Sequence, residues 1–180
     1  MRTLGIDPGL RATGYGVVDL VGSRLVRVAG GVIRPGGNCL ASRLAGIMER
    51  LENVISETRP DHAALEAVFV SRNARSALLL GQARGAALTA CGRAGIPTAE
   101  CAPAAVKVAV TGYGRASKDQ VQRMVQRLLG LGKPPASDEA DALAVAICHG
   151  HSLPAQGQAS TSARLLPGRR GRGATPEMRR

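Results

Sequence analysis

Four acidic residues border or interrupt apolar segments, in a chain of 180 residues whose formal net charge is +11. They are Asp7, Glu66, Asp138 and Asp141. Asp7 closes the run 1–6, Glu66 interrupts the stretch 63–69, and the other two open the last helical pattern. A buried charge is costly unless it is paired or ligated. Divalent cations between these acids and a phosphate backbone would satisfy both partners.

The chemistry expected of such a set is phosphodiester hydrolysis. Carboxylate oxygens are the ligands that Mg²⁺ and Mn²⁺ prefer. Two ions roughly 3.5 to 4 Å apart share a phosphate oxygen, so that one activates the attacking water and the other stabilises the leaving oxygen. The cleaved strand would end in a hydroxyl and a phosphate.

The spacing of the last two acids supports a shared site. Asp138 and Asp141 are three residues apart in the first turn of a helix, where they share one face and the helix dipole stabilises negative charge. Glu139 lies between them and should point elsewhere. Each acid also has a simpler interpretation: the aspartate pair as helix caps, and Asp7 as a turn former before Pro8-Gly9.

The elements that must position these acids follow from apolar periodicity and from Gly and Pro punctuation. The pattern predicts strands over 2–7, 14–20, 25–34, 62–68 and 98–101. It predicts helices from Asn38 to Thr58, over 73–94, 103–110 and 118–129, and from a Ser137 N-cap to about residue 149. Three strands joined by short turns favour an antiparallel meander, followed by helices and two further strands.

Composition limits the remaining possibilities. No apolar run approaches the ~18 to 20 residues of a membrane span, and no leader pattern opens the chain, so a cytoplasmic protein is expected. The cysteines have no C-x-x-C pair and are interpreted as buried free thiols: Cys39, Cys91, Cys101 and Cys148. His149 and His151 are interpreted as surface residues at a helix end rather than as zinc ligands.

Two segments keep two interpretations each. The helix over 73–94 carries small residues (Ala77, Gly81, Gly85 and Ala86), which allow close approach either by a second subunit or by the sheet. Residues 153–180 form an Arg-rich tail, since residues 152–180 hold six arginines and one acid. Its composition predicts disorder, and it is interpreted either as an electrostatic arm for DNA or as a solubilising extension. The domain itself is expected to span residues 1–152.

Several motifs together resemble a known family. They are Gly5-Ile6-Asp7-Pro8-Gly9, Thr13-Gly14-Tyr15-Gly16, Leu65-Glu66 and Ser137-Asp138-Glu139-Ala140-Asp141-Ala142. In order and spacing they resemble RuvC, the bacterial Holliday junction resolvase, over residues 1 to about 151. The resemblance implies an α/β, RNase H-like fold: a five-stranded mixed sheet, with three antiparallel strands and then two parallel ones, flanked by helices.

The resemblance also implies an activity. A homodimer would nick symmetrically related strands of a four-way DNA junction with Mg²⁺, leaving ligatable ends, in recombination and repair. It would act in the cytoplasm at the nucleoid, beside the RuvA–RuvB branch-migration complex. The four acids match the metal-binding acids of the family, and Mn²⁺ is expected to substitute for Mg²⁺.

Candidate DNA contacts flank these acids. Phe69, the only phenylalanine, lies near Arg72 and Arg75 and could stack on bases at the junction, or else close the core. Lys107 and Lys118 match basic residues that the family places near the scissile phosphate, and Arg115 lies in the loop between them. For any single lysine, a solvated surface position is the simpler interpretation.

Three other functions fit parts of the pattern. The first is a nuclease of the same fold that acts on RNA or RNA–DNA hybrids. The second is a non-catalytic junction-binding protein, which is disfavoured because four acids at a DNA face repel phosphate without a metal. The third is an actin-like ATPase, which is disfavoured because the chain has no second domain of similar size.

Overall fold

The structure is a computed structural model, and it describes residues 1–67 and 73–153. Its centre is a five-stranded sheet of order β3-β2-β1-β4-β5. The strands are β1 (Arg2–Asp7), β2 (Thr13–Val21), β3 (Arg24–Ile33), β4 (His62–Glu66) and β5 (Thr98–Cys101). β1 pairs antiparallel with β2 and parallel with β4, and β5 adds in parallel to β4. The predicted RNase H-like arrangement of three antiparallel and two parallel strands is therefore confirmed.

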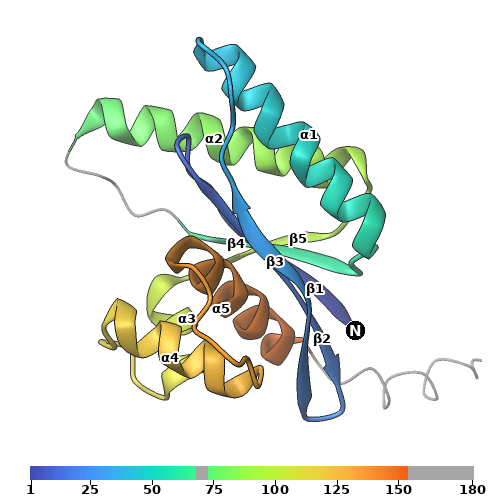
Figure 1. Ribbon diagram of the computed structural model, residues 1–180, viewed down its shortest axis with the longest axis vertical. Helices are drawn as coiled ribbons and strands as arrows, with labels where there is room; N and C mark the ends of the chain where they lie inside the picture. The colour runs from blue at the N-terminus through green and yellow to red at the C-terminus, as the bar shows by residue number, and fades with distance from the viewer. Residues whose placement is uncertain (68–72, 154–180) are drawn as a thin grey trace, which may run out of the picture.

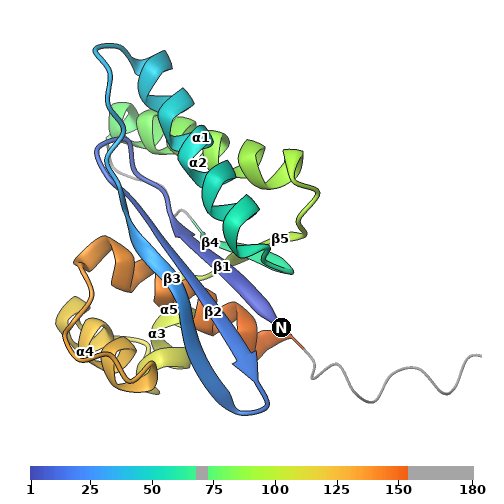
Figure 2. The same ribbon diagram turned by 45° about the vertical axis from the view of Figure 1, so that its right-hand side comes forward.

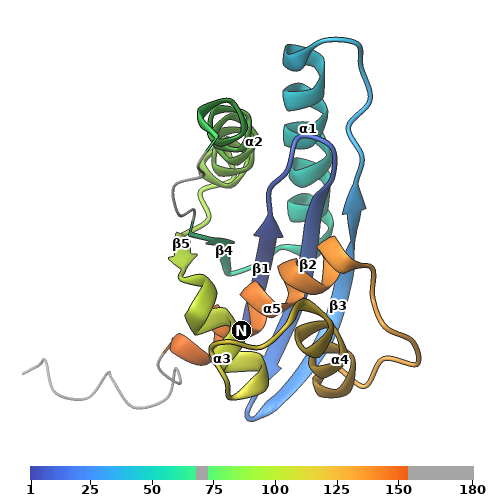
Figure 3. The ribbon, with the colours of Figure 1, turned by 90° about the vertical axis from the view of Figure 1, so that its left-hand side faces the viewer.

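Helices cover both faces of the sheet (Figure 1). On one face lie α1 (Leu40–Thr58) and α2 (Ala74–Arg93), whose apolar side chains join Leu4, Ile6 and Leu65 in one core cluster. On the other face lie α3 (Pro103–Thr111), α4 (Lys118–Leu128) and α5 (Ser137–Ser152), which form a second cluster with Val18 and Ala64. Figure 3 shows the sheet between these two layers. The β2–β3 hairpin projects past the N-terminal end of β1 (Figure 2).

Three glycines let α5 lie directly on the sheet. A Cβ on Gly5 would stand 2.0 Å from the carbonyl oxygen of Ala142, and one on Gly14 would stand 1.9 Å from that of Asp138. A Cβ on Gly16 would stand 2.6 Å from the Leu143 side chain. Alternate residues of a strand face the same side, so Gly14 and Gly16 open one continuous track on β2. The first turn of α5 is thereby set against β1 and β2.

Most element boundaries match the expectations within one or two residues, and the exceptions have local causes. The N-cap of α1 is Cys39 rather than Asn38, since Ser42 completes a capping box with it. Ser137 is already helical and Ala136 takes the N-cap position. β4 ends at Glu66, before the predicted end at residue 68, which lies outside the described residues. α5 runs on to Ser152.

Two expectations about burial are wrong. Cys39 is exposed because it caps a helix at the surface, whereas the other three cysteines are buried as predicted. His149 is only 7% exposed, since it lies on the buried face of α5, where its ring centroid is 5.6 Å from that of His62. His151 is exposed. In the described ranges, no helix is both long and apolar enough to cross a membrane.

Candidate active site

The parallel pairing of β1 with β4 brings two of the predicted acids together. Ile6 pairs with Leu65, so the next residues, Asp7 and Glu66, end neighbouring strands at the same edge of the sheet. Both follow fully buried residues, which fixes their backbones. The first turn of α5 then lies against this edge, because the glycine track on β1 and β2 admits it.

A cleft of about 230 Å³ forms where these elements meet. It is lined by Asp7, Glu66, Asp141, Lys107 and Lys118, with Pro103, Val106, Val121, Ala144 and Val145 as its apolar wall. Three acids and two lysines, far apart in the sequence, thus share one small cavity. Asp138 does not line the cleft, although its charge acts on Asp7.

The cleft is unfavourable for so many negative charges. Burial, followed by the charges of Asp141, Glu66 and Asp138, raises the pKa of Asp7 to about 7. Burial and the charge of Asp141 also raise the pKa of Glu66. Positive charges oppose both effects, with Lys118 acting on both acids and Lys107 on Glu66. A carboxylate pKa near neutrality is typical of a functional site that needs a further cation.

Lys118 supplies the positive charge that contacts Asp141. Its Nζ lies 2.6 Å from Oδ2 of Asp141, and this hydrogen bond raises the pKa of Lys118. The lysine is the first residue of α4 after the Ser117 cap, so the start of that helix presents it to the cleft. Within residues 1–67 and 73–153, no three His, Cys, Asp or Glu side chains are arranged so as to hold a metal ion. Lys118 is the cation that Asp141 contacts.

Two arginines that the sequence analysis did not single out position the acids. Arg84 of α2 donates a 2.7 Å hydrogen bond to the backbone carbonyl of Glu66 and forms a 2.6 Å ion pair with Glu100. Arg27 of β3 donates to Glu139 at 2.7 Å and thereby ties the first turn of α5 to the sheet. The prediction that Glu139 points away from the other acids is therefore confirmed. Both contacts span long sequence separations, and local patterns carry no signal for them.

Of the predicted DNA-contacting residues that the structure describes, only two lie in the cleft. Lys107 and Lys118 line the cleft, whereas Arg115 is exposed in the loop between α3 and α4 and does not line it. Arg75 is exposed in the first turn of α2. Phe69 and Arg72 lie outside the described residues.

Comparison with known proteins places the chain in one family. A family model described as crossover junction endodeoxyribonuclease RuvC matches residues 3–149. A crossover junction endodeoxyribonuclease RuvC from Burkholderia vietnamiensis is 55% identical over 152 residues, which is 84% of each chain. The Burkholderia multivorans protein of the same name is 54% identical over 151 residues, again 84% of each chain.

Solved structures of Holliday junction resolvases are also similar to this chain. Thermus thermophilus RuvC in complex with a Holliday junction substrate superposes with a TM-score of 0.79 at 37% identity, covering 83% of this chain and 93% of that one. A yeast mitochondrial Holliday junction resolvase superposes with a TM-score of 0.56 at 12% identity, covering 81% of this chain and 77% of that one. The second likeness concerns the fold alone.

Proposed function

The chain belongs to the RuvC family of crossover junction endodeoxyribonucleases, and we propose that it resolves four-way DNA junctions by metal-dependent phosphodiester hydrolysis in the Asp7–Glu66–Asp141 cleft. The observation that carries this proposal is the placement of three acids and two lysines in one cavity, at an edge of the sheet. Acids alone would repel a phosphate backbone, so their place in a basic protein is explained by a cation that mediates contact with DNA.

The residues fit divalent cations in donor type and charge. All four predicted ligands, Asp7, Glu66, Asp138 and Asp141, are hard oxygen donors. Burial, and then the charges of neighbouring acids, raises the pKa values of Asp7 and Glu66, and a bound cation would offset both effects. Mg²⁺ is the proposed ion, Mn²⁺ its substitute, and two ions per cleft the proposed number. When bound, such ions would supply an activated water and stabilise the leaving oxygen. For Asp141 to become a ligand, it would have to exchange its contact with Lys118.

The lysines are proposed to bind the substrate. Lys107 on α3 and Lys118 on α4 both line the cleft, and the charges of both lower the pKa of Glu66. Once freed from Asp141, the Lys118 ammonium group can bind a nonbridging oxygen of the scissile phosphate. The apolar wall keeps bulk water from one side of the site, which strengthens these contacts. Phe69, Arg72, Arg75 and Arg115 remain proposed contacts to the surrounding DNA.

A homodimer is proposed to form through α2. The face of α2 that packs inward uses Ala83, Ala87 and Ala90, so Gly81 and Gly85 are not needed for contact with the sheet. Both glycines are exposed, and a Cβ on either would meet no atom within 4 Å. Leu78, exposed at 63%, and Leu88, exposed at 37%, lie beside them. A second copy of the helix is the proposed partner of this small, apolar stripe.

Sedimentation velocity tests the dimer. Gly85→Glu should shift the protein to monomer, and it should not unfold the helix, because glutamate is a better helix former than glycine. The matched control is Ala45→Glu on the exposed side of α1, which should leave the dimer intact. Equal behaviour of the two variants would reject α2 as the interface.

The proposed division of the chain is a nuclease domain over 1–152 and an Arg-rich tail over 153–180. All but the first residue of this tail lie outside the described residues. Deletion of residues 154–180 should weaken junction binding and flatten its salt dependence if the tail is a DNA arm. If the salt dependence of junction binding is unchanged by the deletion, the tail is a solubilising extension instead. Action beside RuvA–RuvB at the nucleoid is proposed from membership of the family.

The decisive experiment uses a labelled four-way junction whose branch point can migrate, with and without Mg²⁺, beside linear duplex and RNA–DNA hybrid controls. Paired, ligatable nicks in the junction alone, and only with the metal, are expected. Cleavage of the hybrid instead would favour the ribonuclease alternative. Binding without any cleavage would favour a scaffold.

A further inference from the structure

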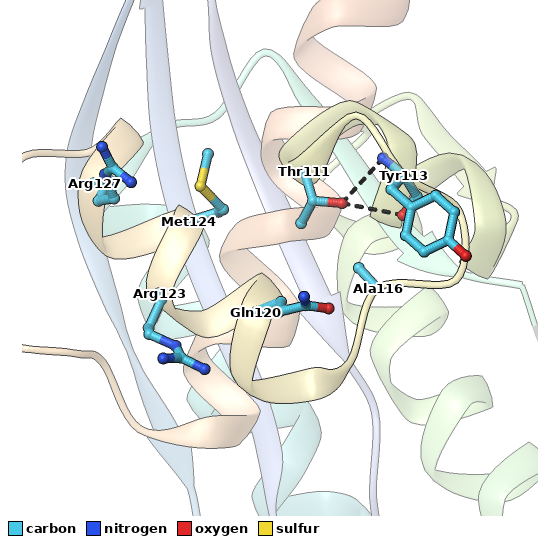
Figure 4. Close-up of a pocket in the computed structure, with 7 residues that line it drawn as sticks. All are labelled: Thr111, Tyr113, Ala116, Gln120, Arg123, Met124 and Arg127. Carbon is cyan, nitrogen blue, oxygen red and sulfur yellow. Dashed lines mark hydrogen bonds between the residues drawn. The ribbon is translucent and has the colours of Figure 1, made fainter.

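A second groove lies on the far side of α4 from the catalytic cleft. It measures about 370 Å³ and is lined by Thr111, Tyr113, Ala116, Gln120, Arg123, Met124 and Arg127. Figure 4 shows Tyr113 on one side of the groove and the two arginines on the other, along α4. None of these side chains contributes to the catalytic cleft, and the function proposed above does not use them.

The groove lies in a strongly basic segment of the chain. Residues 112–135 contain five basic residues and one acid, Asp119. Arg123 and Arg127 are one helical turn apart on the same face of α4, and neither belongs to an ion pair in the part of the chain that the structure describes. Among the described residues, Arg123 donates only to the backbone carbonyl of Asp119, at 3.2 Å. Adjacent guanidinium groups without counterions favour a ligand with repeated negative charges.

The opposite wall presents an aromatic ring. Tyr113 is one of two tyrosines in the chain, and its side chain is 58% exposed. Its backbone is held by the Thr111 hydroxyl through hydrogen bonds of 3.0 and 3.2 Å, both drawn in Figure 4. An exposed ring on an anchored backbone, opposite two arginines, offers a stacking surface beside a phosphate site. Together these groups match the alternating chemistry of a nucleic-acid strand.

The groove and the cleft share one helix, α4, which lies between them. Lys118 and Val121 of this helix line the cleft, while Arg123 and Arg127 line the groove. Arg127 lies nine positions beyond Lys118, which is roughly 13 Å along a helix. DNA advances about 3.4 Å per nucleotide along one strand, so this separation corresponds to about four nucleotides.

We propose that this groove is an accessory DNA site, in which Arg123 and Arg127 bind backbone phosphates and Tyr113 stacks on a base or sugar, about four nucleotides from the scissile phosphate. The inference rests on the proposed function, since the strand that reaches the groove is the one cut in the cleft. It adds residues outside the catalytic machinery that hold the junction arm in register.

The test is junction binding by Arg123→Gln/Arg127→Gln in the full-length chain, measured against salt concentration. The expected result is weaker binding and a slope of log K against log salt that is smaller by about 2, because each lost phosphate contact contributes about 0.9. The control is Arg43→Gln/Arg50→Gln on α1, which removes the same charge from the opposite face of the sheet. Equal slopes in the two double variants would overturn the proposal and leave the groove to another partner, such as an acidic protein surface.

Two further readouts keep the test specific. Tyr113→Leu should weaken binding by about tenfold without changing the salt slope, because stacking releases no counterions. Hydroxyl-radical footprinting should show that Arg123→Gln/Arg127→Gln loses protection about four nucleotides from the cut but keeps it at the cut itself. Loss of protection at the cut alone would contradict the groove assignment. Metal-dependent cleavage by the unaltered protein, measured in parallel, tests the proposed function separately.

Discussion

The ammonium nitrogen of Lys118 lies 2.6 Å from Oδ2 of Asp141, so the acid that α5 presents to the cleft contacts a lysine from the start of α4. A divalent cation and this lysine would compete for the same carboxylate. Under the proposed function, metal binding would therefore release this lysine toward the phosphate. The ion pair also connects α4 and α5, which both line the cleft.

Replacing Asp141 with asparagine should abolish cleavage and preserve binding. Asp141→Asn removes a proposed metal ligand and one negative charge from a surface that faces phosphate. Loss of a residue that only supports a metal ligand costs about 10- to 100-fold, so loss of a ligand should cost more than about 100-fold in rate. Junction affinity should be equal or higher in a gel-shift assay. If binding and cleavage disappear together, Asp141 has a structural role instead.

Lys118→Met should separate metal binding from catalysis. Without its competitor, Asp141 should bind Mn²⁺ at a lower concentration, which electron paramagnetic resonance of the free ion measures directly. Cleavage at saturating metal should nevertheless fall, because a phosphate contact is lost. Lys133→Met is the control, since Lys133 is exposed and does not line the cleft. An unchanged or weaker Mn²⁺ affinity in Lys118→Met would contradict the proposed competition.

The pKa of Asp7, raised to about 7, predicts how metal affinity depends on pH. Below this pH the carboxyl group of the metal-free protein holds a proton that the metal must displace. Mn²⁺ affinity should therefore rise from pH 6 to pH 7 and level off above about pH 7.5. A flat profile over this range would mean that Asp7 is already ionised without metal.

His149 predicts a loss of stability in mild acid. Burial, and secondarily the nearby His62, lowers the pKa of His149, so the unfolded chain takes up a proton more readily than the folded one. Stability is thus retained above the unfolded pKa of about 6.5 and lost as the pH falls below it, by at most ~1.4 kcal/mol per pH unit. Urea unfolding at pH 7.5 and pH 5.5 measures the difference. His149→Gln should reduce it, whereas His151→Gln, at an exposed position, should not.

Gly14→Ala should displace the first turn of α5. The new Cβ would stand 1.9 Å from the carbonyl oxygen of Asp138, which requires the helix to move. Overpacking of this kind costs roughly 1 to 3 kcal/mol, and the cleavage rate should fall in the fraction that remains folded. Gly92→Ala is the control, because its Cβ would meet no atom within 4 Å. Normal activity in folded Gly14→Ala would show that the position of α5 is not critical.

The sequence by itself was sufficient to predict the strands and helices and to single out the four acids as candidate ligands. Alternation and turn residues predicted all five strands, since local propensity and a buried face act together in each of them. Asp7 and Glu66 could be singled out because a charge at the edge of an apolar strand needs a physical reason, and this holds before any contact is known. The first-turn position of Asp138 and Asp141 followed from helical geometry alone.

Only the tertiary structure decided which of these groups meet. Asp7 and Glu66 are neighbours because β1 pairs with β4, and Asp141 joins them because Gly5 and Gly14 let α5 approach the sheet. Those contacts join residues more than fifty positions apart, and packing, not local propensity, selects them. The same reason explains why Arg27 and Arg84 escaped notice, and why His149 is buried although a helix end is usually exposed.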